Sequence, residues 1–294
     1  MTTEDYNEST INLDMLPTIE MVRIMNEEDK KVAFAVEKAI PDISKAIDII
    51  VERLDLGGRL IYVGAGTSGR LGVLDAVECY PTFGVASDMV KAVIAGGERA
   101  ITSAIEYAED DIIQGKEEIK TIGVNEKDVV VGITASGSTP FVMGALEEAH
   151  NLGASTILIT NNYNSPIKNL VDVAIEIDTG PEVIAGSTRL KAGTSQKMVL
   201  NMLSTLSMVK LGKVYGNIMV DLRPTNKKLI NRAVNIIQRV TGVSEEIALI
   251  RLRECDMNVK EAIVSIARNL SPIKSRELLQ RYHGHLRKAL EEVS

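Results

Sequence analysis

The chain has 294 residues, of which 45% are hydrophobic, 25% charged and 3% aromatic. Such a chain is long and apolar enough to bury a core in one large domain or two modest ones. Lys and Arg total 33 against 40 Asp and Glu, which gives a formal net charge of -7 and disfavours sequence-independent binding to nucleic acid. With 2 cysteines and 3 histidines, we expect neither a disulfide framework nor a metal site.

Residues 1–12 are polar and acidic, and they lack the basic start and apolar core of a secretory signal. The longest apolar runs, such as residues 129–134, are too short to span a bilayer. We therefore expect a cytoplasmic protein that makes no contact with membranes.

The first part of the chain reads as a polar arm, residues 1–25, that has no core of its own. Asn26 is predicted to cap a helix whose apolar residues recur at helical spacing, and Pro41 is expected to break or restart that helix. A second helix is predicted over residues 43–54.

Short β-rich runs then alternate with helical stretches, which is typical of a parallel sheet covered by helices. The predicted strands are residues 59–63, 91–94, 128–134, 155–160 and 171–177, and the predicted helical stretches are 69–79, 98–120, 139–152 and 191–212. After Pro224 helices are predicted over 227–240, 244–254, 259–269 and 273–290. The predicted fold class is α/β, a doubly wound and mostly parallel sheet flanked by helices in residues 26–224, followed by a small helical subdomain in 225–294.

A glycine-rich turn follows the first predicted strand, with Gly64, Gly66 and Gly69 in the spacing G-x-G-x-x-G. Glycines in such a turn let backbone amides approach a phosphate, whose charge the helix N-terminus attracts. A dinucleotide site would also require an acidic residue at the end of the next strand, where this chain has Ala95. A dinucleotide therefore fits poorly.

Hydroxyl groups gather in this turn and in a second turn, residues 134–139, after the third predicted strand. The hydroxyl residues considered for binding are Thr67, Ser68, Ser136, Ser138 and Thr139. Because the carboxyl ends of the strands share one edge of a doubly wound sheet, both turns can face one crevice. Helix capping would explain Ser68 or Ser138 alone, but it explains the whole cluster less well. We therefore predict a phosphate or sugar-phosphate site that includes Gly66.

These turns resemble those of the sugar isomerase domain, which binds phosphosugars. Longer stretches resemble N-acetylmuramic acid 6-phosphate etherases: GAGTSGRLG at 64–72, ECYPTFG at 78–84, AEDD at 108–111 and GPEVIAGSTRLKAGTSQKMVLNM at 180–202. The resemblance covers nearly the whole chain. One departure is Tyr80, where the family is expected to carry a second proline before Pro81.

The resemblance implies cleavage of the D-lactyl ether of N-acetylmuramic acid 6-phosphate by elimination of lactate and addition of water, in cell-wall sugar recycling. It implies no cofactor, and it implies a homodimer. The family's two catalytic carboxylates fall on Glu78 and Glu109. Glu78 is expected near the end of a helix, where the helix dipole disfavours a carboxylate and suits a proton donor. Glu109 is then the base, although the division of the two roles stays open.

Several alternatives remain open from the residues themselves. The acidic run around Glu109 is typical of a solvated helix face. Arg189 and Lys191 can neutralise a phosphate or the lactate carboxylate, or they can be ordinary polar residues at a helix start. The protein could also be a phosphosugar-binding regulator of the glucokinase regulatory protein type, or a phosphosugar isomerase. A nicotinamide oxidoreductase is less favoured than either.

Overall fold

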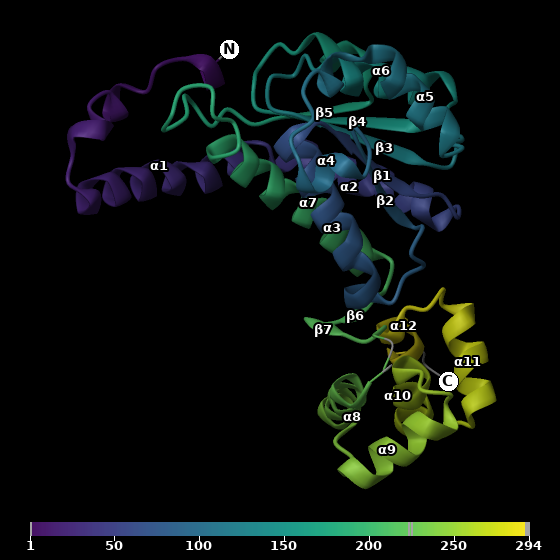
Figure 1. Ribbon diagram of the computed structural model, residues 1–294. Helices are drawn as coiled ribbons and strands as arrows, with labels where there is room; N and C mark the ends of the chain where they lie inside the picture. The colour runs from purple at the N-terminus through teal and green to yellow at the C-terminus, as the bar shows by residue number, and fades with distance from the viewer. Residues whose placement is uncertain (1, 223, 225, 292–294) are drawn as a thin grey trace. The chain divides into compact units, whose positions relative to one another are not determined.

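A computed structural model describes residues 2–222, 224 and 226–291 (Figure 1). The chain forms two compact units, which are described separately. The first comprises Met1–Val77 and Ser87–Ser204, and the second comprises Glu78–Ala86 and Thr205–Ser294. The division predicted between residues 224 and 225 adjoins Arg223 and Thr225, which lie outside the described residues, and it stays a prediction.

Within the described residues, the first unit contains a five-stranded sheet in the order β2-β1-β3-β4-β5, with every pair of neighbours parallel. The strands are β1 (Leu60–Gly64), β2 (Val90–Ile94), β3 (Val129–Thr134), β4 (Ser155–Thr160) and β5 (Val173–Glu176). The strand order reverses at β1, so the carboxyl ends of β1, β2 and β3 lie together at the edge where open α/β sheets bind ligands. The predicted strands and parallel sheet are confirmed.

Helices cover both faces of this sheet. They are α1 (Thr18–Lys38), α2 (Ile40–Asp55), α3 (Gly66–Phe83), α4 (Arg99–Thr102), α5 (Ile112–Thr121), α6 (Pro140–Asn151) and α7 (Lys191–Lys210), of which α3 and α7 continue into the second unit. Ile61 of β1 packs in one cluster with Phe141 of α6, whereas the next residue, Tyr62, donates a hydrogen bond to Asp75 of α3 (2.8 Å). Successive strand residues point to opposite faces of a sheet, so Ile61 and Tyr62 meet helices on opposite faces. Helices therefore lie on both sides of the sheet, and the doubly wound prediction is confirmed. Figure 1 shows α5 and α6 together on one side.

The second unit is mainly helical, as predicted. It contains the antiparallel pair β6 (Val214–Tyr215) and β7 (Ile218–Met219), and the helices α8 (Lys227–Thr241), α9 (Glu245–Glu254), α10 (Val259–Arg268), α11 (Pro272–Arg281) and α12 (Leu286–Glu291). Buried residues of these helices, such as Ile237, Leu252 and Ile263, form its core. Across the described part of both units, no helix is both long enough and apolar enough to cross a membrane.

Two helix predictions in the first unit are wrong. The predicted start at Asn26 lies inside α1, which begins at Thr18 directly after Pro17, a residue that cannot donate a helical hydrogen bond. Residues 98–120 do not form one helical stretch, because the chain leaves α4 after Thr102. A new helix, α5, begins where the Asp111 side chain accepts a hydrogen bond from the Gln114 amide (2.8 Å).

In the second unit the predicted helix 273–290 is two helices. His283 and Gly284 adopt the left-handed conformation (φ 52° and 77°), which ends α11 before α12 begins. The β6–β7 pair was missed, because strands of two residues carry no readable periodicity.

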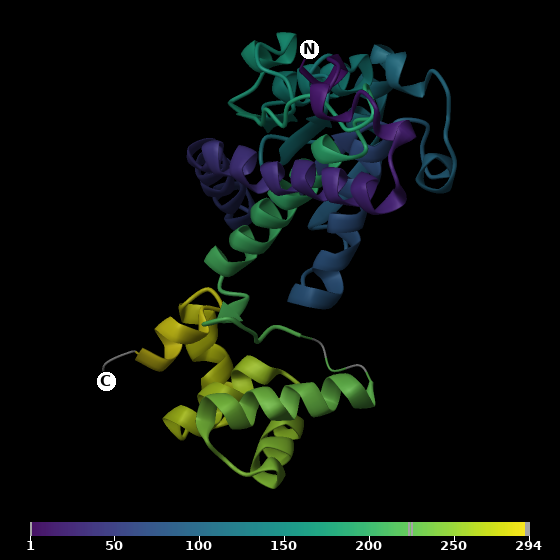
Figure 2. The ribbon, with the colours of Figure 1, turned by 90° about the vertical axis from the view of Figure 1, so that its left-hand side faces the viewer.

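The amino-terminal arm is anchored to the first unit. It forms short 3-10 turns at Thr2–Glu4, Glu8–Thr10 and Leu13–Met15. Thr3 of the arm is fully buried, and its hydroxyl accepts a hydrogen bond from Asn162 Nδ2 (3.1 Å). The Asn7 side-chain amide donates to the Pro181 carbonyl (3.3 Å). Figure 2 shows the arm beside the segment that precedes α7.

Candidate functional site

The glycine-rich turn joins β1 directly to α3. Gly66 has φ +53°, a left-handed conformation that favours glycine and turns the chain from strand into helix. A Cβ atom at Gly69 would lie 2.7 Å from the carbonyl oxygen of Gly64, so glycine alone allows this helix start to approach the strand so closely. The Gly69 amide donates to the Ala65 carbonyl (3.1 Å). The amides of residues 66–68 precede this bond and have no intrahelical acceptor, which suits them to bind an anion.

The two hydroxyls of this turn differ in their surroundings. Ser68 is buried, and its hydroxyl donates to Oε1 of Gln196 in α7 (2.8 Å). Thr67 is half-buried and lies near Gly193, where an added Cβ would be 3.4 Å from the Thr67 methyl group. Helix capping does not account for Ser68, because its side chain bonds to another helix.

The second turn, residues 134–139, gathers its hydroxyls around Thr134 and Ser136. The hydroxyl of Thr134 lies 2.7 Å from that of Thr139 and 3.2 Å from that of Ser136, and Ser136 Oγ accepts from both Ser138 N and Ser138 Oγ (3.2 Å each). Thr139 precedes α6 but makes no side-chain capping bond. Ser136, Ser138 and Thr139 are each half-buried. Capping therefore does not explain this cluster either.

The two turns leave the sheet from neighbouring strands. Gly64 at the end of β1 is paired in register with Ile133 near the end of β3. Both turns thus follow strand ends at the same edge of the sheet. Binding of one phosphate by both turns stays a prediction.

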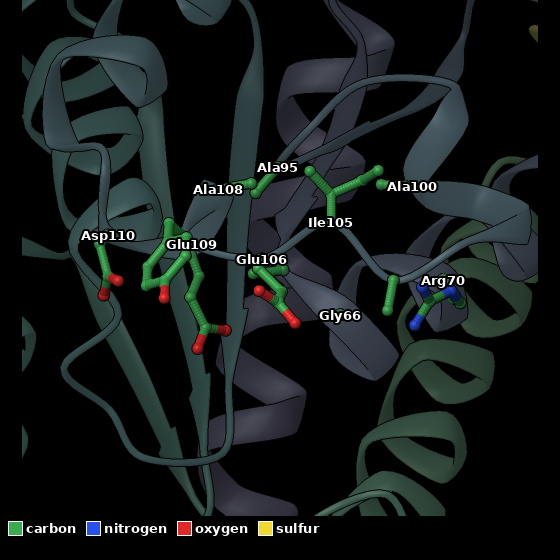
Figure 3. A pocket seen from close by; sticks show the side chains of 12 residues that line it. Gly66, Arg70, Ala95, Ala100, Ile105, Glu106, Ala108, Glu109 and Asp110 are labelled. Carbon is green, nitrogen blue, oxygen red and sulfur yellow. The ribbon is translucent and has the colours of Figure 1, made fainter.

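A pocket of about 500 Å³ opens beside the first turn, within the first unit (Figure 3). It is lined by Ala65 and Gly66 of the turn, by Arg70 of α3, by Ala95 after β2, and by residues of the segment 100–110. Figure 3 shows the carboxylates of Glu106, Glu109 and Asp110 extending toward the same side of this segment. The pocket therefore combines carboxylates with the amino end of α3.

The segment that forms one wall of this pocket contains a residue in the left-handed conformation and is hydrogen-bonded to an arginine. Tyr107 adopts a left-handed conformation (φ 63°), which is uncommon for a non-glycine residue and separates Glu106 from Glu109. Arg70 donates hydrogen bonds to the carbonyls of Ile101 (3.2 Å) and Ser103 (2.8 Å). Arg70 thus fixes the start of the segment that carries the carboxylates.

Glu109 lies in a 3-10 turn, Ala108–Asp110, and it is exposed at the pocket. Glu109 is therefore not on the predicted helical stretch, but the alternative of a solvated acidic residue stays open because its side chain is exposed. Glu78 is also exposed and lies near the end of α3, but it belongs to the second unit, whereas Glu109 belongs to the first. The pairing of Glu78 with Glu109 stays a prediction.

The two cations before and at the start of α7 differ sharply. Arg189 is exposed, whereas Lys191 is 1% exposed and its ammonium donates to Glu28 Oε2 (2.7 Å). Burial opposes ionisation of Glu28, but the hydrogen bonds from Lys191 and Lys31 outweigh it and lower the pKa of Glu28 to about 2. The Lys191 ammonium is thus engaged by a carboxylate of α1.

The amino end of α7 is occupied by a buried carboxylate. Glu182 accepts hydrogen bonds from the backbone amides of Lys191 and Ala192 (2.9 Å each), and burial raises its pKa. Sequence reasoning missed both Glu28 and Glu182. Glu28 stands in the polar run 26–31, which looks like a solvated helix face, and no local signal marks either residue as buried.

The parallel sheet covered by helices is the fold of a SIS, or sugar isomerase, domain, and comparisons with known proteins agree. Family profiles match the SIS domain over residues 120–206, the N-terminal SIS domain of glucokinase regulatory protein over 42–150, and the C-terminal lid domain of glucokinase regulatory protein over 216–266. A phosphoheptose isomerase from Francisella tularensis has a similar fold, with a TM-score of 0.52, 18% identity, and coverage of 66% of this chain and 100% of that chain. The protein is a SIS-domain protein.

Relatives that match along the whole length give the particular family. An N-acetylmuramic acid 6-phosphate etherase from Clostridium beijerinckii is 53% identical over 293 residues, covering 100% of this chain and 96% of the relative. One from Caldanaerobacter subterraneus is 52% identical over 289 residues, covering 98% and 94%. The chain belongs to the N-acetylmuramic acid 6-phosphate etherase family, as its motifs predicted.

Proposed function

We propose that this protein cleaves the D-lactyl ether of N-acetylmuramic acid 6-phosphate, yielding N-acetylglucosamine 6-phosphate and D-lactate. The observation that carries the proposal is the similarity to etherases over 100% of the chain at 53% identity. The pocket beside α3 supports it, because it combines amides suited to an anion with carboxylates suited to proton transfer.

The phosphate of the substrate is held by the amides of residues 66–68, by the hydroxyl of Thr67 and by the hydroxyls of the second turn. The amino end of α3 carries a partial positive charge, and backbone amides and hydroxyls at such a helix end are groups that bind phosphate without a metal. Arg189, which is exposed, suits the lactyl carboxylate or the phosphate. Lys191 supports α7 through its pair with Glu28 and meets the anion only indirectly.

The reaction proceeds in the open-chain form of the sugar. Glu109 removes the proton from C2, which is acidified by the adjacent aldehyde, and the C3–O bond breaks as the double bond forms. Glu78 protonates the departing lactyl oxygen. Water then adds to C3 with help from one carboxylate, and C2 regains a proton. The net change is the addition of one water molecule without oxidation or reduction, so we propose no cofactor.

Two alternatives use the same domain and are distinguished by their products. A regulator of the glucokinase regulatory protein type would bind phosphosugars without converting them, and it would have no use for an acid at Glu78. A phosphosugar isomerase would produce a ketose and no lactate. Whole-length similarity to etherases favours neither alternative.

We also propose that the protein is a cytoplasmic homodimer that acts in cell-wall sugar recycling, with an arm in residues 1–25, a sugar isomerase domain in 26–224 and a helical subdomain in 225–294. Leu74 and Val77 of α3 support a partner subunit, because 52% and 58% of their surfaces are exposed.

The test is incubation of the purified protein with N-acetylmuramic acid 6-phosphate and measurement of D-lactate by a coupled dehydrogenase. N-acetylmuramic acid without phosphate is the matched control and should react far more slowly. Formation of a ketose would support the isomerase. Phosphosugar binding without any product would support the regulator.

A further inference from the structure

A series of buried side-chain hydrogen bonds connects the two hydroxyl turns within the first unit. Ser68 of the first turn donates its hydroxyl proton to Gln196 Oε1 (2.8 Å), and Gln196 Nε2 donates to Asn161 Oδ1 (2.9 Å). Asn161 follows β4, and Gln196 lies in α7. Both amide side chains are fully buried.

Asn161 also reaches the second turn. Its backbone amide donates to the carbonyl of Ala135 (3.2 Å), which directly precedes Ser136. The neighbouring side chain, Asn162, donates to the same carbonyl (2.8 Å). The start of the second hydroxyl turn is thus held by two donors from the end of β4.

The remaining bonds fix the direction of this network. Asn161 Nδ2 donates to Ser195 Oγ (2.7 Å) and to the carbonyl of Ile177 (3.2 Å), and Ser195 Oγ donates to the carbonyl of Ala192 (2.7 Å). Each amide therefore has one orientation that satisfies all its partners. Rotation of Gln196 would place its Oε1 against Asn161 Oδ1, which are two acceptors, and rotation of Asn161 would place its Nδ2 against Gln196 Nε2, which are two donors. Either mismatch is costly at a buried site.

The direction of the bonds has a consequence for Ser68. A serine hydroxyl carries one proton, and that of Ser68 is donated to Gln196. While this bond exists, the hydroxyl has no proton to donate to a phosphate oxygen. The first turn can still offer the backbone amides of residues 66–68 and the hydroxyl of Thr67, which is half-buried.

We propose that Gln196 and Asn161 are positioning residues that hold the two hydroxyl turns at the spacing one phosphate requires. Ser68 acts through this network and does not contact the phosphate. The inference rests on the proposed phosphosugar site, because it assumes that both turns bind the same group. It assigns function to two residues that do not line the pocket beside the first turn.

The test measures the affinity for N-acetylglucosamine 6-phosphate by calorimetry, which does not require the ether to be cleaved. Gln196→Met keeps the volume but removes both polar atoms, and we expect it to raise the Kd about tenfold, the effect of one displaced hydrogen bond. Ser68→Ala should raise it by a similar factor. The matched control is Asn201→Leu, which removes a different hydrogen bond of α7, that to Asp75 Oδ1 (2.7 Å). The control should leave the Kd within about twofold.

The double variant Ser68→Ala/Gln196→Met decides between the two roles of Ser68. If Ser68 acts through Gln196, the double variant binds as weakly as either single variant. If Ser68 contacts the phosphate, the two losses multiply to about a hundredfold, which overturns the proposal. Unchanged affinity in Gln196→Met, or equal loss in Asn201→Leu, overturns it as well.

Ser68→Ala is the smaller change and guards against a Gln196→Met variant that fails to fold. It removes only the hydroxyl that donates to Gln196 and leaves the hydrogen bond between Gln196 and Asn161 in place. An unchanged Kd in Ser68→Ala, with an unchanged melting temperature, contradicts the network. Lactate release by the unchanged protein tests the proposed function separately.

Discussion

The buried ion pair between Lys191 and Glu28 predicts a specific loss of stability in acid. Glu28 is 3% exposed, and its side chain accepts hydrogen bonds from Lys191 (2.7 Å), from Ser9 (3.0 Å) and from Lys31. Burial alone would favour the neutral acid, but these partners lower its pKa from 4.5 to about 2. At about 1.4 kcal/mol per pH unit, this decrease corresponds to about 3 kcal/mol of folding free energy.

The sign of the effect follows from the two states. Because the pKa of Glu28 is lower in the folded protein than in the unfolded chain, its contribution is complete well above pH 4.5 and is lost as the pH falls toward 2. Glu28 is still mostly ionised at pH 3 when folded but is protonated when unfolded. Between pH 7 and pH 3, about 2 kcal/mol of the contribution is therefore lost.

The assay is urea unfolding of the unchanged protein and of the double variant Glu28→Leu/Lys191→Met at pH 7, 5, 4 and 3. Replacing both partners removes the pair without leaving a buried charge. The free energy of unfolding of the unchanged protein should fall by about 2 kcal/mol more than that of the variant over this range. Glu28→Gln alone leaves Lys191 unpaired and should cost about 3 kcal/mol at pH 7. Equal pH dependence of the unchanged protein and the double variant would refute the reasoning.

Further predictions concern the reaction and the turns. Glu109→Gln should stop both lactate release and the entry of solvent deuterium at C2, detected by NMR, and continued deuterium entry would exclude it as the base. Glu78→Gln should stop lactate release but keep C2 exchange and phosphosugar binding, and undiminished turnover would exclude it as the acid. Gly69→Ala places a Cβ 2.7 Å from a backbone oxygen and should cost about 2 kcal/mol in urea unfolding; an unchanged midpoint would contradict the close approach. Thr3→Val removes an acceptor for buried Asn162 and should lower the melting temperature, and no decrease would show that the arm adds no stability.

Much of the sheet was predictable because its strands are short, apolar and bounded by turn residues. The run 129–134 is buried along its whole length, and such strands read as continuous apolar stretches. Helix limits were less predictable where a single backbone conformation decides them. The left-handed Tyr107, for example, belongs to a segment whose sequence still looks helical.

The candidate site was predictable only where its chemistry is local. The hydroxyl turns are visible because several residues with phosphate-binding groups stand within a few positions of each other. The partners of Lys191 and Ser68 are not local: Glu28 is 163 positions from Lys191, and Gln196 is 128 positions from Ser68. A cation and a hydroxyl look available in the sequence, and only packing shows that each is already bonded.

The most direct test of the proposed reaction is turnover of N-acetylmuramic acid 6-phosphate in ¹⁸O-labelled water, with the masses of both products measured. The aldehyde oxygen at C1 also exchanges with water, so unlabelled N-acetylglucosamine 6-phosphate incubated in the same water is the control. Reduction of both samples with borohydride stops this exchange, and the label found in the control is subtracted. Elimination followed by water addition predicts one ¹⁸O at C3 of the sugar and none in the hydroxyl group of D-lactate. Label in the lactate hydroxyl would mean displacement at the lactyl carbon and would contradict the mechanism, and absence of lactate would contradict the proposed function itself.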